Sequence, residues 1–92
     1  MKIEPMTSHS GKPVQNQFII FTQEATFFQS YQTIIAKNTV EGRKRVTYLD
    51  EKYWNYSRTT SRYLAAFLGE PIKTVREHVK SGKYRLTDLN SD

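Results

Sequence analysis

The sequence contains no cysteine, and it has only four glycines and three prolines among 92 residues. Without cysteine the chain cannot form a disulfide scaffold, a thiolate metal site or a cysteine nucleophile, and we expect it in a reducing, cytoplasmic compartment. The few glycines and prolines, with a hydrophobic share of 37%, are not typical of a disordered chain. We therefore expect a folded protein.

Long hydrophobic runs are also missing. The longest apolar run is the six residues 63–68, and the N-terminus has no hydrophobic signal core, so we expect neither a membrane-spanning segment nor secretion. A chain of this length can bury one self-sufficient core. We expect a flexible N-terminal arm over residues 1–16, which are polar and almost free of apolar side chains, and a single domain over residues 17–92.

Residues suited to catalysis are few. The chain has two histidines, and one of them, His9, lies in the expected arm. His78 beside Glu77 matches no metal-ligand spacing. Asp50 and Glu51 are adjacent, which on a strand would point them to opposite faces. We expect a non-enzymatic protein without a metal or another cofactor.

Positive charge is concentrated in the second half of the chain. The formal net charge is +5, and residues 43–85 carry eleven Lys or Arg against four Asp or Glu, a balance of +7. An excess of positive charge attracts phosphate backbones, anionic lipid and acidic protein surfaces alike, so it does not identify the ligand. The alternative is a well-solvated surface with no dedicated ligand.

The alternation and composition of residues 17–49 predict an antiparallel β-meander. The β-rich stretches are residues 17–22, 26–36 and 44–49, and a polar loop is expected at residues 38–42. The stretch 26–36 fits either one bent strand or two. The expected sheet therefore has three to four strands.

Two helices are predicted after the meander. Ser57 can cap the first, whose apolar positions recur at three- and four-residue spacing until Gly69. Pro71 opens the second, which Gly82 ends. The fold class is α+β, a small β-meander packed on one face by two C-terminal helices, and residues 84–89 could add an edge strand.

These helices should present cations to solvent. Helical phase places Arg58 and Arg62 opposite the apolar stripe of the first helix. On the second helix it places Lys73, Arg76 and Lys80 beside the apolar face. We interpret this surface as a nucleic-acid-binding face, with a solvated surface as the alternative. The candidate binding residues are Arg58, Arg62, Lys73, Thr74, Arg76 and Lys80.

Aromatic residues are interleaved with basic ones between Tyr48 and Tyr63, a pattern typical of surfaces on which unpaired bases stack. We expect Trp54 in the core, as a packing anchor at the corner between strand and helix. Tyr53 and Tyr56 fit either a core position or a stacking role.

The segment SRYLAAFLGEPIKTVREHVKSG, residues 61–82, resembles a helix-turn-helix of DNA-binding repressors. Ala65, Gly69 and Val75 stand where that motif has its small residue, its turn and its buried position in the second helix. The resemblance implies that the second helix enters a major groove, with Lys73, Thr74, Arg76 and Glu77 near base edges or phosphates. The sequence departs from the motif at His78, where an apolar residue is usual.

A second resemblance covers residues 18–90. The strings FQSYQTIIA, YWNYSRTTSRYLAAFLG and KSGKYRLTDLN are similar to a group of short phage and mobile-element proteins of unknown function. This resemblance implies a viral origin and a small accessory role in the host cytoplasm, and it brings no established activity.

We therefore expect a phage-type accessory protein that binds nucleic acid through the basic face of its two helices. The alternative is a protein-binding inhibitor of a host defence or replication protein, similar in role to anti-CRISPR proteins. A self-associating structural protein is the third interpretation, and the sequence leaves the oligomeric state, monomer or dimer, open.

Overall fold

The fold consists of one six-stranded sheet and two helices, in a computed structural model that describes residues 1–91. The strands lie side by side in the order in which they occur along the chain. They are β1 (Lys2–Thr7), β2 (Pro13–Phe21), β3 (Ala25–Ser30), β4 (Thr33–Glu41), β5 (Lys44–Asp50) and β6 (Tyr84–Thr87). The first five pair antiparallel as a meander, and β6 adds to the edge parallel to β5.

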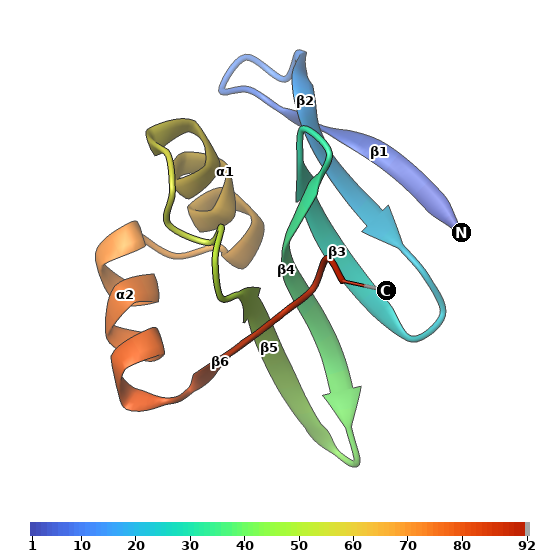
Figure 1. Cartoon of the computed structure of the whole chain (residues 1–92). Helices are drawn as coiled ribbons and strands as arrows, with labels where there is room; N and C mark the ends of the chain where they lie inside the picture. Colours follow the sequence, from blue (N-terminus) through green and yellow to red (C-terminus); the bar gives the residue numbers. More distant parts are fainter. Residues whose placement is uncertain (92) are drawn as a thin grey trace.

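Both helices, α1 (Arg58–Leu68) and α2 (Ile72–Ser81), lie on one side of the sheet (Figure 1). This confirms the α+β class. The expected count of three to four strands was too low. The two strands beyond the expected meander are β1, from the expected flexible arm, and β6, which is the edge strand that residues 84–89 could add.

The first sixteen residues do not form the flexible arm that their composition predicts. Residues 2–7 form β1, which pairs with β2 from Lys2 opposite Phe21 to Pro5 opposite Phe18. Met6 is buried, with 6% of its surface exposed. A polar sequence can form an edge strand because the hydrogen bonds between strands join backbone groups and do not depend on the side chains.

The β-rich stretch of residues 26–36 forms two strands. β3 ends at Ser30, and a two-residue turn with Tyr31 at φ +57° leads into β4. The polar loop expected at residues 38–42 is instead strand as far as Glu41. Its polar side chains find partners across the sheet, since Thr47 Oγ1 donates to Asn38 Oδ1 at 2.7 Å.

The helix boundaries agree with the sequence. The Ser57 hydroxyl accepts a hydrogen bond from the Thr60 amide at 3.1 Å, as an N-cap does. Gly69 ends α1 in the left-handed conformation, φ +71°, which glycine adopts without a steric penalty. Pro71 precedes α2 and Gly82 ends it. Because these signals are local, the sequence alone is sufficient to locate them.

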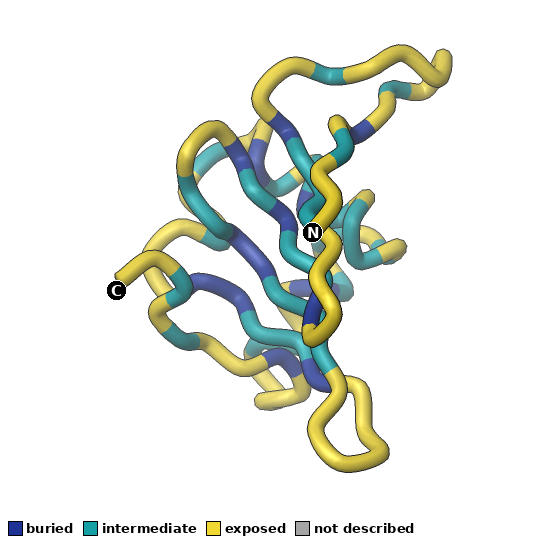
Figure 2. Tube along the Cα trace, turned by 90° about the vertical axis from the view of Figure 1, so that its right-hand side faces the viewer, coloured by how far each residue is buried: buried dark blue, intermediate teal, exposed yellow. Residues whose placement is uncertain are grey.

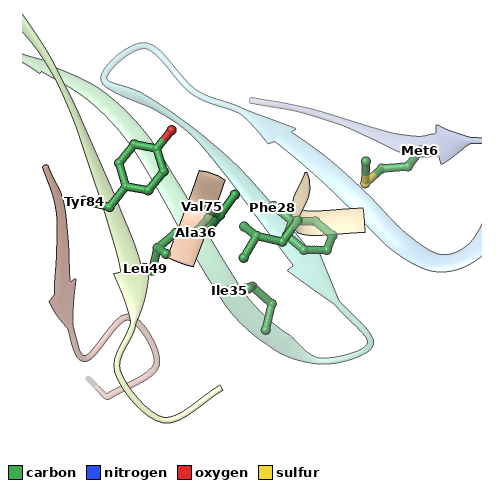
Figure 3. Packing of buried hydrophobic residues seen from close by; sticks show 8 residues of the cluster. Met6, Phe28, Ile35, Ala36, Leu49, Val75 and Tyr84 are labelled. Atoms are coloured by element: carbon green, nitrogen blue, oxygen red, sulfur yellow. The ribbon is translucent and has the colours of Figure 1, made fainter. Parts of the chain in front are cut away.

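The core lies between the sheet and the helices. Phe28, Ala36 and Leu49 from three adjacent strands are fully buried near Val75 of α2 (Figure 3). Leu64 of α1 is also fully buried. Complete burial of an aliphatic or aromatic side chain contributes about 1.5 to 3 kcal/mol relative to its exposure, so these contacts dominate the attachment of the helices.

A buried polar contact also ties α1 to the sheet. The hydroxyls of Ser30 in β3 and Thr60 in α1 lie 3.1 Å apart, and both residues are fully buried. Buried segments follow the central strands, while the turns between strands are exposed (Figure 2). Within residues 1–91, neither helix is long and apolar enough to cross a membrane.

Candidate nucleic-acid interface

A groove with a volume of about 570 Å³ lies between α1, α2 and the segment that leads into α1. We call it the arginine groove, because three of the side chains that line it are arginines. Its lining residues are Asn55, Tyr56, Ser57, Arg58, Ser61, Arg62, Ala65, Ile72 and Arg76.

Helical periodicity explains why these side chains meet. Thr60 and Leu64 mark the buried stripe of α1, and Arg58 and Arg62 lie roughly opposite that stripe. On α2, Arg76 lies one turn after Ile72 and next to the buried Val75. Burial of the two stripes therefore leaves arginines from both helices on the groove between them.

The groove is electropositive. The ion pairs formed within residues 1–91 are Lys2–Glu4, Arg85–Glu41 and His78–Glu70, so no groove arginine is neutralised by an acidic side chain there. The first turn of α1 contains no acidic residue. The amino end of a helix carries a partial positive charge, which adds to the attraction for an anion.

Aromatic side chains lie next to these cations. Tyr56 lines the groove and is 53% exposed, and its ring meets that of Tyr53 edge-on at 5.6 Å. The Arg62 guanidinium lies 5.7 Å from the ring of the half-buried Tyr63. Trp54 packs against the core, as predicted. Tyr53 and Tyr56, for which the sequence left a core position and a stacking role open, are both exposed at the surface.

The structure brings together three of the six predicted binding residues. Arg58, Arg62 and Arg76 line the groove, whereas Lys73, Thr74 and Lys80 lie outside its lining. Lys73 and Lys80 are exposed cations one turn from Arg76, and Thr74 is half-buried. They extend the basic surface along α2 without entering the concavity.

Other groove residues were not among the predicted binding residues. Asn55 and Ile72 reach the site because the segment before α1 and the start of α2 converge, an arrangement that helical phase alone does not reveal. Ser61 Oγ donates to Asn55 Oδ1 at 3.5 Å. The hydroxyls of Ser57 and Thr60 are used in the cap and in the contact with Ser30. The hydroxyls of Ser57, Thr60 and Ser61 at the start of α1 thus serve structural hydrogen bonds.

The helix-turn-helix spacing predicts buried residues on both helices and a turn at Gly69. Leu64 and Val75 are fully buried, and Gly69 takes a left-handed conformation at the turn. The sheet and a turn precede α1, where that motif has a further supporting element. Insertion of α2 into a major groove stays a prediction.

Glu70, His78 and Tyr84 form a second polar cluster. The Tyr84 hydroxyl donates to Glu70 Oε1, and His78 Nδ1 lies 3.1 Å from the same oxygen. The rings of His78 and Tyr84 meet edge-on at 4.9 Å. Burial, together with the hydrogen bond to Glu70 and its negative charge, raises the pKa of Tyr84 well above its ordinary value. The cluster links the turn between the helices to α2 and β6.

A larger hollow, of about 760 Å³, lies where β2 to β5 extend past the end of α1. Its lining mixes Phe67 and Leu68 with threonines, and its cations Arg45 and Lys83 are accompanied by Glu24. The arginine groove is smaller, but it has three cations and no acid in its lining. For an anionic ligand the arginine groove is therefore the stronger candidate.

Comparison with models of known protein families places the chain in a family. Residues 1–85 match a family of unknown function, DUF8033, and the chain belongs to this family. The match covers β1, which the resemblance to phage proteins did not reach. Neither the curated proteins nor the solved structures gave a match.

Proposed function

We propose that this member of the DUF8033 family is a non-enzymatic accessory protein that binds nucleic acid through the arginine groove. The observation that carries the proposal is the convergence of Arg58, Arg62 and Arg76, from two helices, on one groove whose lining contains no acid.

Arginine is well suited to phosphate. Its planar guanidinium offers paired N–H donors that match two phosphate oxygens, and it keeps its charge at any physiological pH. Three such groups beside the amino end of α1 make a site for more than one phosphate. Lys73 and Lys80, exposed on α2, would strengthen the long-range attraction.

The surroundings of the acid and base groups support binding over catalysis. His78 is engaged with Glu70, and His9 is an exposed turn residue far along the chain from the groove. Asp50 is buried and accepts several hydrogen bonds. The groove lining itself contains no histidine or carboxylate to act as a general base.

A phage-type accessory role is part of the proposal. Its support is the similarity of residues 53–69 to short phage and mobile-element proteins. In that setting the ligand would be viral or host nucleic acid in the host cytoplasm.

Binding of labelled single-stranded and double-stranded DNA and RNA at about 50 mM salt tests the proposal, because phosphate contacts are strongest at low salt. Affinity should fall as salt is raised to about 200 mM. If none of the four ligands binds at the lower concentration, the proposal is wrong.

An acidic protein surface is the second candidate ligand, as an inhibitor of a host defence or replication protein would bind. It is favoured by the apolar part of the groove, because Tyr56, Ile72 and Ala65 lie beside the arginines. Tyrosine and arginine are enriched among the few residues that carry most of the binding energy in protein interfaces. Pull-down from host lysate with the wild type and with Arg58→Ala, followed by mass spectrometry, would identify such a partner.

A further inference from the structure

We infer that the arginine groove takes single-stranded nucleic acid, with one base stacked on Tyr56 and the neighbouring phosphates held by the groove arginines. This inference rests on the proposed function and specifies its ligand. It is the alternative to the major-groove insertion that the helix-turn-helix resemblance implies.

The shape of the site favours a single strand. A protein reads duplex DNA by inserting a projecting helix or ribbon into a major groove about 12 Å wide. Here the arginines line a concavity between two helices, and Lys73 and Thr74 of α2 lie outside its lining. The backbone of a duplex is stiff and would touch the rim of such a concavity, whereas a flexible single strand can follow its floor.

Tyr56 supplies the stacking surface. It is 53% exposed, and it lines the same groove as Arg58 and Arg62. An exposed ring next to cations is the arrangement on which unpaired bases stack, since every base has a π face. The edge-on contact with Tyr53 packs the Tyr56 ring against a second aromatic side chain.

The cations are placed to accompany a stacked base. Arg58 and Arg62 lie one turn apart on α1, and Arg76 approaches from α2, so phosphates on both sides of the base meet a guanidinium. Asn55, beside Tyr56, offers an amide donor and acceptor to a base edge or sugar. The remaining wall, Ala65 and Ile72, is apolar and can contact a second base.

Fluorescence anisotropy with a labelled 15-nucleotide oligodeoxythymidine, and with a duplex of the same length, tests the inference. We expect the single strand to bind more tightly than the duplex. Tyr56→Ala should weaken single-strand binding by at least about fivefold, as loss of one stacked base predicts, whereas Tyr56→Phe should stay within about twofold of the wild type.

Tyr31→Ala is the matched control, because Tyr31 is 51% exposed but lies in the β3–β4 turn outside the groove. It should bind like the wild type. Circular dichroism of each variant checks that the fold is retained, and Tyr56→Phe keeps the test valid if Tyr56→Ala does not fold, since the phenylalanine ring still stacks.

The outcomes separate the inference from the proposed function. Tighter binding of the duplex, or equal single-strand affinity of Tyr56→Ala and the wild type, overturns the inference and leaves nucleic-acid binding in place. Loss of Tyr56→Phe binding also overturns it, because the ring without its hydroxyl should be sufficient. If the single strand does not bind the wild type, the inference is overturned, and the proposed function is overturned with it only when double-stranded DNA and both forms of RNA also fail to bind.

Discussion

Asn90 donates a hydrogen bond from Nδ2 to Oδ1 of Asp50 at 2.9 Å, joining residues 40 positions apart. The same carboxylate accepts from the Leu89 amide at Oδ1, and from the Lys52 and Tyr53 amides at Oδ2. Asp50 is 1% exposed. It therefore fixes both the C-terminal tail and the turn that leads to the arginine groove.

Replacing Asp50 with alanine should lower the free energy of unfolding by about 3 kcal/mol, because four donors lose a buried charged acceptor. Urea denaturation measures the change. The neighbouring exposed acid provides the control, and Glu51→Ala should stay within about 0.5 kcal/mol of the wild type. Equal stability of the two variants would contradict the role assigned to Asp50.

Replacing Arg58 with alanine should reduce the salt dependence of binding. Each phosphate neutralised contributes about 0.7 to the slope of log affinity against log salt for a single strand, and about 0.9 for a duplex. If Arg58 neutralises one phosphate, we expect the slope for Arg58→Ala to be smaller by about 0.7 with a single strand and by about 0.9 with a duplex. Stability should change by less than about 0.5 kcal/mol, since Arg58 is exposed. The exposed Arg43 in the β4–β5 turn is the control, and Arg43→Ala should keep the wild-type slope.

Replacing Lys73 with alanine distinguishes the two ways in which the helix pair could bind. If the arginine groove is the site, Lys73→Ala should weaken binding less than Arg58→Ala does, because Lys73 lies outside the groove lining. Reading of a major groove by α2 predicts the opposite order, since Lys73 would then lie near bases or phosphates. Competition titrations at one fixed salt concentration give the order directly.

The Tyr84 contact should make stability fall at alkaline pH. The folded state raises the pKa of Tyr84, so it holds this proton more tightly than the unfolded chain does. Its contribution is fully present below the unfolded pKa of about 10 and is lost as pH rises above that value. Tyr84→Phe should lose about 1 kcal/mol at neutral pH and show a shallower alkaline decline. Thermal melts from pH 7 to pH 11 compare the two proteins, and parallel curves would contradict the prediction.

The positions of the helices could be predicted from local chemistry. Ser57, Gly69, Pro71 and Gly82 act through their own backbone geometry or that of their immediate neighbours, so they mark helix ends in any tertiary context. The pairing of β1 with β2 could not be predicted in this way. Its polar residues carry little strand preference, and the stability of an edge strand comes from the strand beside it.

For the candidate site, too, the sequence was sufficient for features within one helix and insufficient for contacts between elements. Helical phase was sufficient to place Arg58 and Arg62 on an outer face, because periodicity is a property of one helix. It could not show that Arg76 shares their groove while Lys73 and Lys80 do not, since that depends on how α2 crosses α1. Nor could it place Asn55 and Tyr56 beside them.

The sequence by itself determined the class of the fold, the ends of both helices and the excess of positive charge in the second half of the chain. These follow from composition and from interactions within a few residues. The tertiary structure decided that β1 joins the sheet, that Asp50 anchors the tail, and that three arginines and Tyr56 share one groove. Such relationships depend on long-range packing of buried stripes, which brings together residues that are distant in the chain.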